Sequence, residues 1–205
     1  MHRDLAAAGE STGVPWTQVD DRAMAALSDS VTPAGVVAVC RFLDRPAGHL
    51  IGAADLVVVA ADVRDPGNAG TVIRTADAVG ADAVVLAGQS VDPYNPKTVR
   101  ATVGSLFHVP VALAPEPAPL MAELREAGLG VLAADGGGEL DLFAADEVLR
   151  RPVAWIFGNE AHGLPEELAA LADHRVRIPL LGRAESLNLA TAAAVCLYAT
   201  ARARR

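Results

Sequence analysis

Short apolar runs alternate with amphipathic segments along most of the chain. From about residue 50 onward these runs are apolar at nearly every position, and they are rich in Val, Ile, Leu and Ala. A strand that is buried on both faces has this pattern, whereas a strand with one face in water alternates. The runs predict strands at 55–60, 83–86, 109–112, 130–133, 153–157 and 176–178.

The segments between these strands have helical spacing. In 68–79, for example, Val72, Ala76 and Val79 fall on one face of a helix. Strands that alternate with helices are typical of an α/β fold with a mostly parallel sheet covered by helices. The other helices are expected at 98–105, 120–127, 165–171 and 187–202.

The first 48 residues have a different character. They are polar and mixed, with a short helix expected at 20–28 and a β-branched strand at 36–39. Pro46 and Gly48 then mark a linker. The sequence therefore predicts two parts, an N-terminal extension over 1–48 and an α/β domain over 49–205.

The charge composition bears on nucleic acid binding without deciding it. The 205 residues carry a net charge of −8, which argues weakly against a protein that binds nucleic acid through its overall charge. Lys97 is the single lysine, and every other basic residue except histidine is arginine. The planar guanidinium group of arginine binds phosphate oxygens well, so local clusters of arginine could bind RNA even though the protein as a whole is acidic. The alternative is that the preference for arginine over lysine reflects compositional drift.

Several features favour a cytoplasmic protein. No stretch of about 18 apolar residues occurs without charge or proline, so we expect no membrane span. The N-terminus lacks the apolar run of a signal peptide. Cys40 and Cys196 both lie in apolar runs, which predicts two buried, reduced thiols.

The first segment with candidate chemistry follows the strand at 55–60 and opens a helix. A polar loop at the carboxyl end of a parallel strand is where α/β enzymes bind ligands. Asn68 and Arg74 lie in this segment. The structural alternatives are that Asn68 is a helix N-cap and that Arg74 lies on a solvated helix face.

Two further segments have the same strand–loop–helix setting. Gly158 and Gly163 allow a ligand to approach the backbone, with Glu160 between them, although an ordinary turn is the alternative. Ser186 and Asn188 precede the apolar helix, where Ser186 could simply be the N-cap. The glycine-rich stretch 135–139 also follows a strand, but it lacks the spacing of known nucleotide loops.

Taken in order, the three segments resemble the three motifs of the SpoU (TrmH-like) branch of the SPOUT RNA methyltransferases. Residues 68–75 match N-x-G-x-x-x-R-T, 158–164 match G-N-E-x-x-G-L, and 178–188 match I-P-x-x-G-x-x-x-S-L-N. Any one motif is short, but three in order and in the expected context are specific.

The resemblance implies an enzyme that transfers a methyl group from S-adenosylmethionine to a ribose 2′-hydroxyl of ribosomal or transfer RNA. It also implies a C-terminal trefoil knot, a homodimer, and an N-terminal remnant of a ribosomal-protein-like RNA-binding domain. The implied catalytic residues are Asn68, Arg74, Glu160, Ser186 and Asn188. The implied cofactor-binding residues are Gly158, Ile178, Leu180 and Leu187, with no metal.

Arg74 is the residue that would assist the weakly nucleophilic 2′-hydroxyl. Because arginine is effectively always protonated, we expect it to orient the hydroxyl and phosphate rather than remove the proton. Two other classes stay open: an RNA-binding module of the same fold, and a dinucleotide enzyme, which the missing G-x-G-x-x-G disfavours. Candidate phosphate contacts are Arg64, Lys97, Arg100, Arg183 and the tail 202–205.

Overall fold

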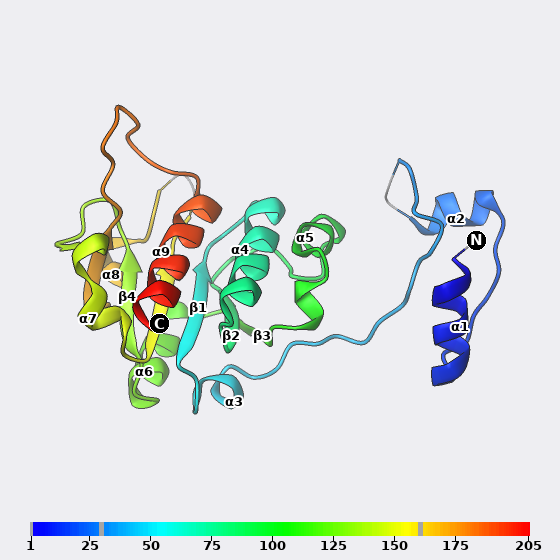
Figure 1. Ribbon diagram of the computed structural model, residues 1–205, viewed down its shortest axis with the longest axis horizontal. Coiled ribbons are helices and arrows are strands. Elements are labelled where there is room, and N and C mark those ends of the chain that lie inside the picture. Colours follow the sequence, from blue (N-terminus) through cyan, green and yellow to red (C-terminus); the bar gives the residue numbers. More distant parts are fainter. Residues whose placement is uncertain (1, 29–30, 160–161) are drawn as a thin grey trace. The chain divides into compact units, whose positions relative to one another are not determined.

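A computed structural model describes residues 2–28, 31–159 and 162–205 of the chain (Figure 1). Internal contacts divide it into two compact units, Met1–Phe42 and Leu43–Arg205. The division falls a few residues before the predicted boundary at 48. No helix in the described parts is long and apolar enough to span a membrane.

The described residues of the first unit form two helices, α1 (Arg3–Thr12) and α2 (Asp21–Leu27). The predicted helix at 20–28 is confirmed, because Asp20 caps α2 by accepting a hydrogen bond from the Ala23 amide at 2.8 Å. The predicted strand at 36–39 is wrong. A strand needs a neighbour for its backbone groups, and Val37 and Val39 are exposed with no paired strand in the described residues.

The second unit is built on a parallel sheet whose order in the described residues is β3-β2-β1-β6-β4-β7-β5. All of its strand pairs are parallel. The strand β1 lies between β2, which follows it in the sequence, and β6, which comes much later in the chain. The strands are β1 (Leu56–Ala61), β2 (Ala83–Ala87), β3 (Val111–Ala114), β4 (Gly130–Ala134), β5 (Leu140–Asp141), β6 (Val153–Phe157) and β7 (His174–Arg177).

Helices cover both faces of the sheet, so successive residues of the central strands enter different cores. Val58 and Trp155 belong to a core shared with α4, α7 and α9, whereas Val57 and Ile156 pack with α3, α6 and α8. This explains why β1, β2 and β6 are buried at every position. The helices are α3 (Gly48–Ile51), α4 (Pro66–Val79), α5 (Pro96–Thr102), α6 (Pro117–Glu126), α7 (Asp146–Leu149), α8 (Glu166–Ala169) and α9 (Leu189–Ala203).

The predicted α/β class is confirmed, and the main errors in it lie at element boundaries. The strand predicted at 109–112 begins later, at Val111, because Pro110 has no amide to donate to the sheet. The helix predicted at 98–105 begins earlier, at Pro96, where Asn95 is the N-cap. It ends where Val103 adopts a left-handed conformation. The short strand β5 was not predicted.

The basic tail lies against the body of the domain. The guanidinium of Arg204 donates hydrogen bonds to the carbonyls of Leu149, Asp55 and Arg151. Partial burial lowers the pKa of Arg204, since its contacts are mostly to neutral carbonyls. Arg204 is therefore a structural anchor rather than a free phosphate contact.

The expectation of two buried thiols is half wrong. Cys196 is fully buried in α9, and burial raises the pKa of its thiol to about 12. Cys40 is exposed, because its apolar neighbours do not form the expected strand.

We expect the two cysteines to differ sharply in reactivity, since the thiolate is the reactive form. At about pH 8, Ellman's reagent should titrate only Cys40 in the native protein and both thiols in guanidinium chloride. A Cys40→Ser variant should give no rapid native reaction. Rapid labelling of Cys196 in that variant would contradict the packing of α9.

Candidate functional site

The site lies at the carboxyl-terminal edge of the sheet, where the connections from β1 and β6 leave in opposite directions. In open α/β sheets a crevice forms at such a switch point. Asp62 follows β1 in a left-handed conformation (φ 55°), and its carbonyl accepts a hydrogen bond from Asn159 Nδ2 at 2.9 Å. Asn159 follows β6, so this bond joins the first and second motif segments across the crevice.

The first motif segment opens α4, but Asn68 is not its N-cap. Asp65 fills that position and accepts a hydrogen bond from the Asn68 amide at 2.8 Å, while Pro66 starts the helix. That bond is the main reason why the pKa of Asp65 is lowered, with a smaller contribution from Lys97 at 3.6 Å. The side chain of Asn68 therefore lies in the first turn of α4 without capping the helix.

The third segment opens α9, and its N-cap is Asn188 rather than Ser186. Asn188 Oδ1 accepts hydrogen bonds from the amides of Ala190 at 2.9 Å and Thr191 at 3.3 Å. Asn188 Nδ2 donates to Asn68 Oδ1 at 3.0 Å. One amide side chain thus caps α9 and joins the third segment to the first, which explains why a polar residue interrupts the apolar run.

A pocket of about 340 Å³ lies beside these contacts. It contains all four predicted cofactor-binding residues, Gly158, Ile178, Leu180 and Leu187, together with the predicted catalytic Ser186. Its other lining residues are Ala134, Asp135, Gly136, Phe157, Asn159, Gly163, Val176, Glu185, Leu189 and Ala192.

Gly158 shows why this pocket needs glycine. A Cβ atom at that position would lie 2.4 Å from the Gly163 carbonyl carbon and 2.4 Å from the Leu164 amide nitrogen. Asn159 and Gly163 also form two backbone hydrogen bonds, in which the amide of each donates to the carbonyl of the other at 2.9 Å. Gly158, Asn159 and Gly163 are therefore held close together, and all three line the pocket.

Asp135 and Gly136 also line the pocket, and they are not among the predicted site residues. A signal for them exists in the sequence, since the glycine-rich stretch 135–139 directly follows β4. This stretch lacks the spacing of the dinucleotide and phosphate-binding loops, so on its own it is only a weak indication of a ligand site.

Of the two charged residues in the predicted catalytic set, the structure describes only Arg74. Arg74 lies on the exposed side of α4 and is outside the described lining of the pocket. Glu160 lies outside the described residues. The structure therefore joins Asn68 to Asn188 by a hydrogen bond, and Ser186, from the same segment as Asn188, lines the pocket.

Comparison with known proteins identifies the family. Residues 55–198 match the model of the SpoU rRNA Methylase family, which covers the parallel sheet and all three motif segments. The chain belongs to this family.

Two curated relatives show the range of similarity. The chain is 38% identical over 189 residues to the 23S rRNA (guanosine(2553)-2′-O)-methyltransferase RlmP of Bacillus subtilis, which covers 91% of this chain and 73% of the relative. It is 40% identical over 144 residues to the 23S rRNA (uridine(2479)-2′-O)-methyltransferase of Streptomyces viridochromogenes, covering 68% of this chain and 50% of the relative. The chain thus spans between half and about three quarters of these two proteins.

Solved structures share the fold. An AdoMet-bound rRNA methyltransferase from Sinorhizobium meliloti superposes with a TM-score of 0.87 at 37% identity, covering 98% of this chain and 76% of that one. The SpoU methyltransferase AviRb from Streptomyces viridochromogenes, in complex with AdoMet, gives a TM-score of 0.72 at 36% identity, covering 78% of this chain and 65% of that one.

Substitutions at Asn188 should separate its two hydrogen-bonding roles. Asn188→Ala removes the cap of α9 and should lower the free energy of unfolding by about 1 kcal/mol. Asn188→Asp keeps the capping oxygen and suits the helix dipole, but it loses the donor to Asn68, so stability should stay within about 0.5 kcal/mol of the wild type. Urea denaturation measures both variants. Equal stability of all three proteins would contradict the capping role.

Proposed function

We propose that this chain transfers a methyl group from S-adenosylmethionine to a ribose 2′-hydroxyl of RNA. The observation that carries the proposal is the pair of hydrogen bonds, from Asn159 to Asp62 and from Asn188 to Asn68, that joins the three motif segments beside one pocket. Membership of the SpoU family and its AdoMet-bound structural neighbours support it.

The pocket suits this donor. Its volume is within the usual range for small-molecule sites. Phe157, Ile178 and Leu187 offer apolar surface for an adenine ring, and the loop at Gly158 offers backbone groups for its polar atoms. Carboxylates at Asp135 and Glu185 suit the positive charge of the donor. When bound, S-adenosylmethionine supplies an electrophilic methyl group.

The chain's own residues would then position the acceptor. We assign Ser186, on the pocket wall, to hold the ribose hydroxyl by a hydrogen bond. Asn68 and Asn188, bonded to one another, keep the acceptor side of the pocket in place. The exposed Arg74 orients the hydroxyl and its phosphate, and Glu160 is assigned to support Arg74 or the donor's surroundings.

Further features follow from the family resemblance and are part of the same proposal. They are a C-terminal trefoil knot, a homodimer in the cytoplasm, and an N-terminal segment over 1–48 that derives from an RNA-binding domain. The exposed Tyr198, beside the partly buried Val195 and Ala199 on α9, is consistent with a dimer contact. Light scattering on the intact chain measures the oligomeric state directly.

The activity has a specific chemical signature. With methyl-labelled donor and total ribosomal and transfer RNA, we expect label in a dinucleotide that resists alkali, because a methylated 2′-oxygen cannot attack the adjacent phosphate. Label released as single nucleotides by alkali would indicate base methylation instead. RNA binding without any transferred label would favour a binding module.

Arg74 provides the sharpest test of the catalytic assignment. Arg74→Ala should lower kcat by about 100-fold or more, the range for a well-placed catalytic group, and should leave the donor Kd within about twofold. Arg151→Ala is the matched control, since its exposed side chain pairs with Glu147 on the surface. Full activity of Arg74→Ala would refute its role.

A further inference from the structure

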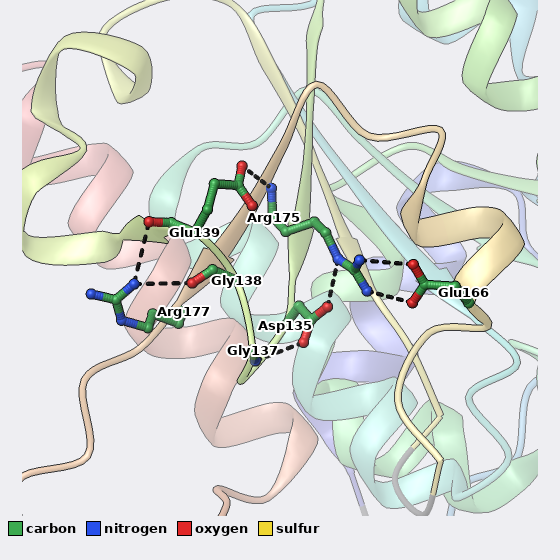
Figure 2. A network of polar contacts seen from close by, with 7 residues as sticks. All are labelled: Asp135, Gly137, Gly138, Glu139, Glu166, Arg175 and Arg177. Carbon is green, nitrogen blue, oxygen red and sulfur yellow. Dashed lines mark hydrogen bonds and ion pairs between the residues drawn. The ribbon is translucent and has the colours of Figure 1, made fainter.

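Arg175 occupies a central position behind the candidate donor pocket. It lies on β7 next to Val176, which lines the pocket, and adjacent strand residues point to opposite faces. Figure 2 shows its guanidinium held between the carboxylates of Asp135 and Glu166.

The contacts of Arg175 have nearly ideal geometry. Its Nε donates to Asp135 Oδ2 at 2.8 Å, and its Nη1 and Nη2 donate to the two oxygens of Glu166 at 2.9 and 2.7 Å. Its backbone amide also donates to Glu139 Oε1 at 3.0 Å. Isolated exposed ion pairs contribute little, but a bidentate arginine within a network of carboxylates is the exception.

The two carboxylates belong to segments that follow two neighbouring strands, β4 and β6. Asp135 directly follows β4 and lines the pocket with Gly136. Glu166 opens α8, shortly after Gly163, which also lines the pocket. A single guanidinium therefore joins the segment that follows β4 to the segment that follows β6.

Backbone contacts hold the turn at Asp135 in place. Asp135 Oδ1 accepts a hydrogen bond from the Gly137 amide at 2.8 Å, and the Gly138 amide donates to the Asp135 carbonyl at 3.0 Å. Gly138 lies so close to β7 that a Cβ atom there would be 2.4 Å from the Arg175 carbonyl oxygen. The turn is thus packed directly on the backbone of the residue whose side chain holds Asp135.

We propose that Arg175 is a positioning residue that ties the segment after β4 to the segment after β6, each of which contributes lining residues, and so preforms the donor pocket for S-adenosylmethionine. The proposal rests on the proposed function, because that function names the donor. Arg175 does not itself line the pocket as described, so it acts through Asp135 and Glu166. Neither predicted motif two nor motif three contains it.

Calorimetric titration of the full chain with S-adenosylmethionine tests the proposal. In Arg175→Met, which keeps an unbranched stem but removes the guanidinium, we expect the donor Kd to rise about tenfold, as when about a tenth of the molecules hold a competent pocket. The kcat for methyl transfer at saturating donor should stay within about twofold, since the reacting groups are untouched. A purely structural role would lower the thermal midpoint and leave the Kd of the folded protein unchanged.

Three further variants sharpen the result. Arg125→Met is the matched control, because it removes an arginine–carboxylate pair near the start of β7, where Arg125 Nε lies 3.1 Å from Asp173 Oδ1 and both side chains are similarly exposed. It should leave the donor Kd unchanged. Arg175→Lys keeps the charge without the fork and should be intermediate. Glu166→Gln, on the exposed first turn of α8, should raise Kd severalfold and carries the test if Arg175→Met does not fold.

The outcomes separate this proposal from the function on which it rests. If the wild type binds S-adenosylmethionine and Glu166→Gln and Arg175→Met bind it equally well, the positioning role is overturned. An equal rise in Kd for Arg125→Met also overturns it, because the effect would then be general loosening. Failure of the wild type to bind the donor would instead overturn the proposed function.

Discussion

Parallel pairing of β1 with β6 is the constraint from which the site follows. Leu56 pairs with Val153 and Ala60 with Phe157, so both strands end at the same edge of the sheet. Their connections then diverge, since β1 leads to β2 on one side while β6 is flanked by β4 on the other. Two loops that are remote in the sequence must therefore emerge side by side.

The hydrogen bonds at this edge show how the loops are kept together. Asn159 donates to the carbonyl of Asp62, and Asn188 donates to the side chain of Asn68 while it caps α9. Neutral amides suit this purpose, because each offers a donor and an acceptor without the desolvation penalty of a charge. Arg175 itself is not among the residues that line the pocket, and the partial exposure of its ionic contacts reduces that penalty.

The sequence predicted the central part of the fold because its strands are buried on both faces. Runs such as 153–157 have no polar position and allow no helical stripe. Prediction failed where tertiary contacts decide the outcome. Val37 and Val39 have strand propensity but no paired neighbour, and Cys40 was consequently placed in a core that does not form.

The site was predictable to the extent that its residues occur in motifs. Gly158, Ile178, Leu180 and Leu187 lie in matching segments, and the structure brings them to one pocket. Arg175 was missed because its contact with Asp135 spans 40 residues of sequence, which no local spacing encodes. Asp135 was missed because its glycine-rich stretch lacks the spacing of known nucleotide loops. The two N-cap alternatives were wrong because Asp65 and Asn188 compete successfully for those positions.

The bonds that close the site also have a consequence for how the protein acquires it. They join residues separated by 97 and 120 positions along the chain, and closing such long loops is entropically unfavourable until the sheet between them has formed. No short stretch of the polypeptide can hold a partial version of the pocket. Ligand binding and cooperative folding are therefore coupled in this molecule. The chain can bind the donor only after the sheet has formed, and no single motif can bind it alone.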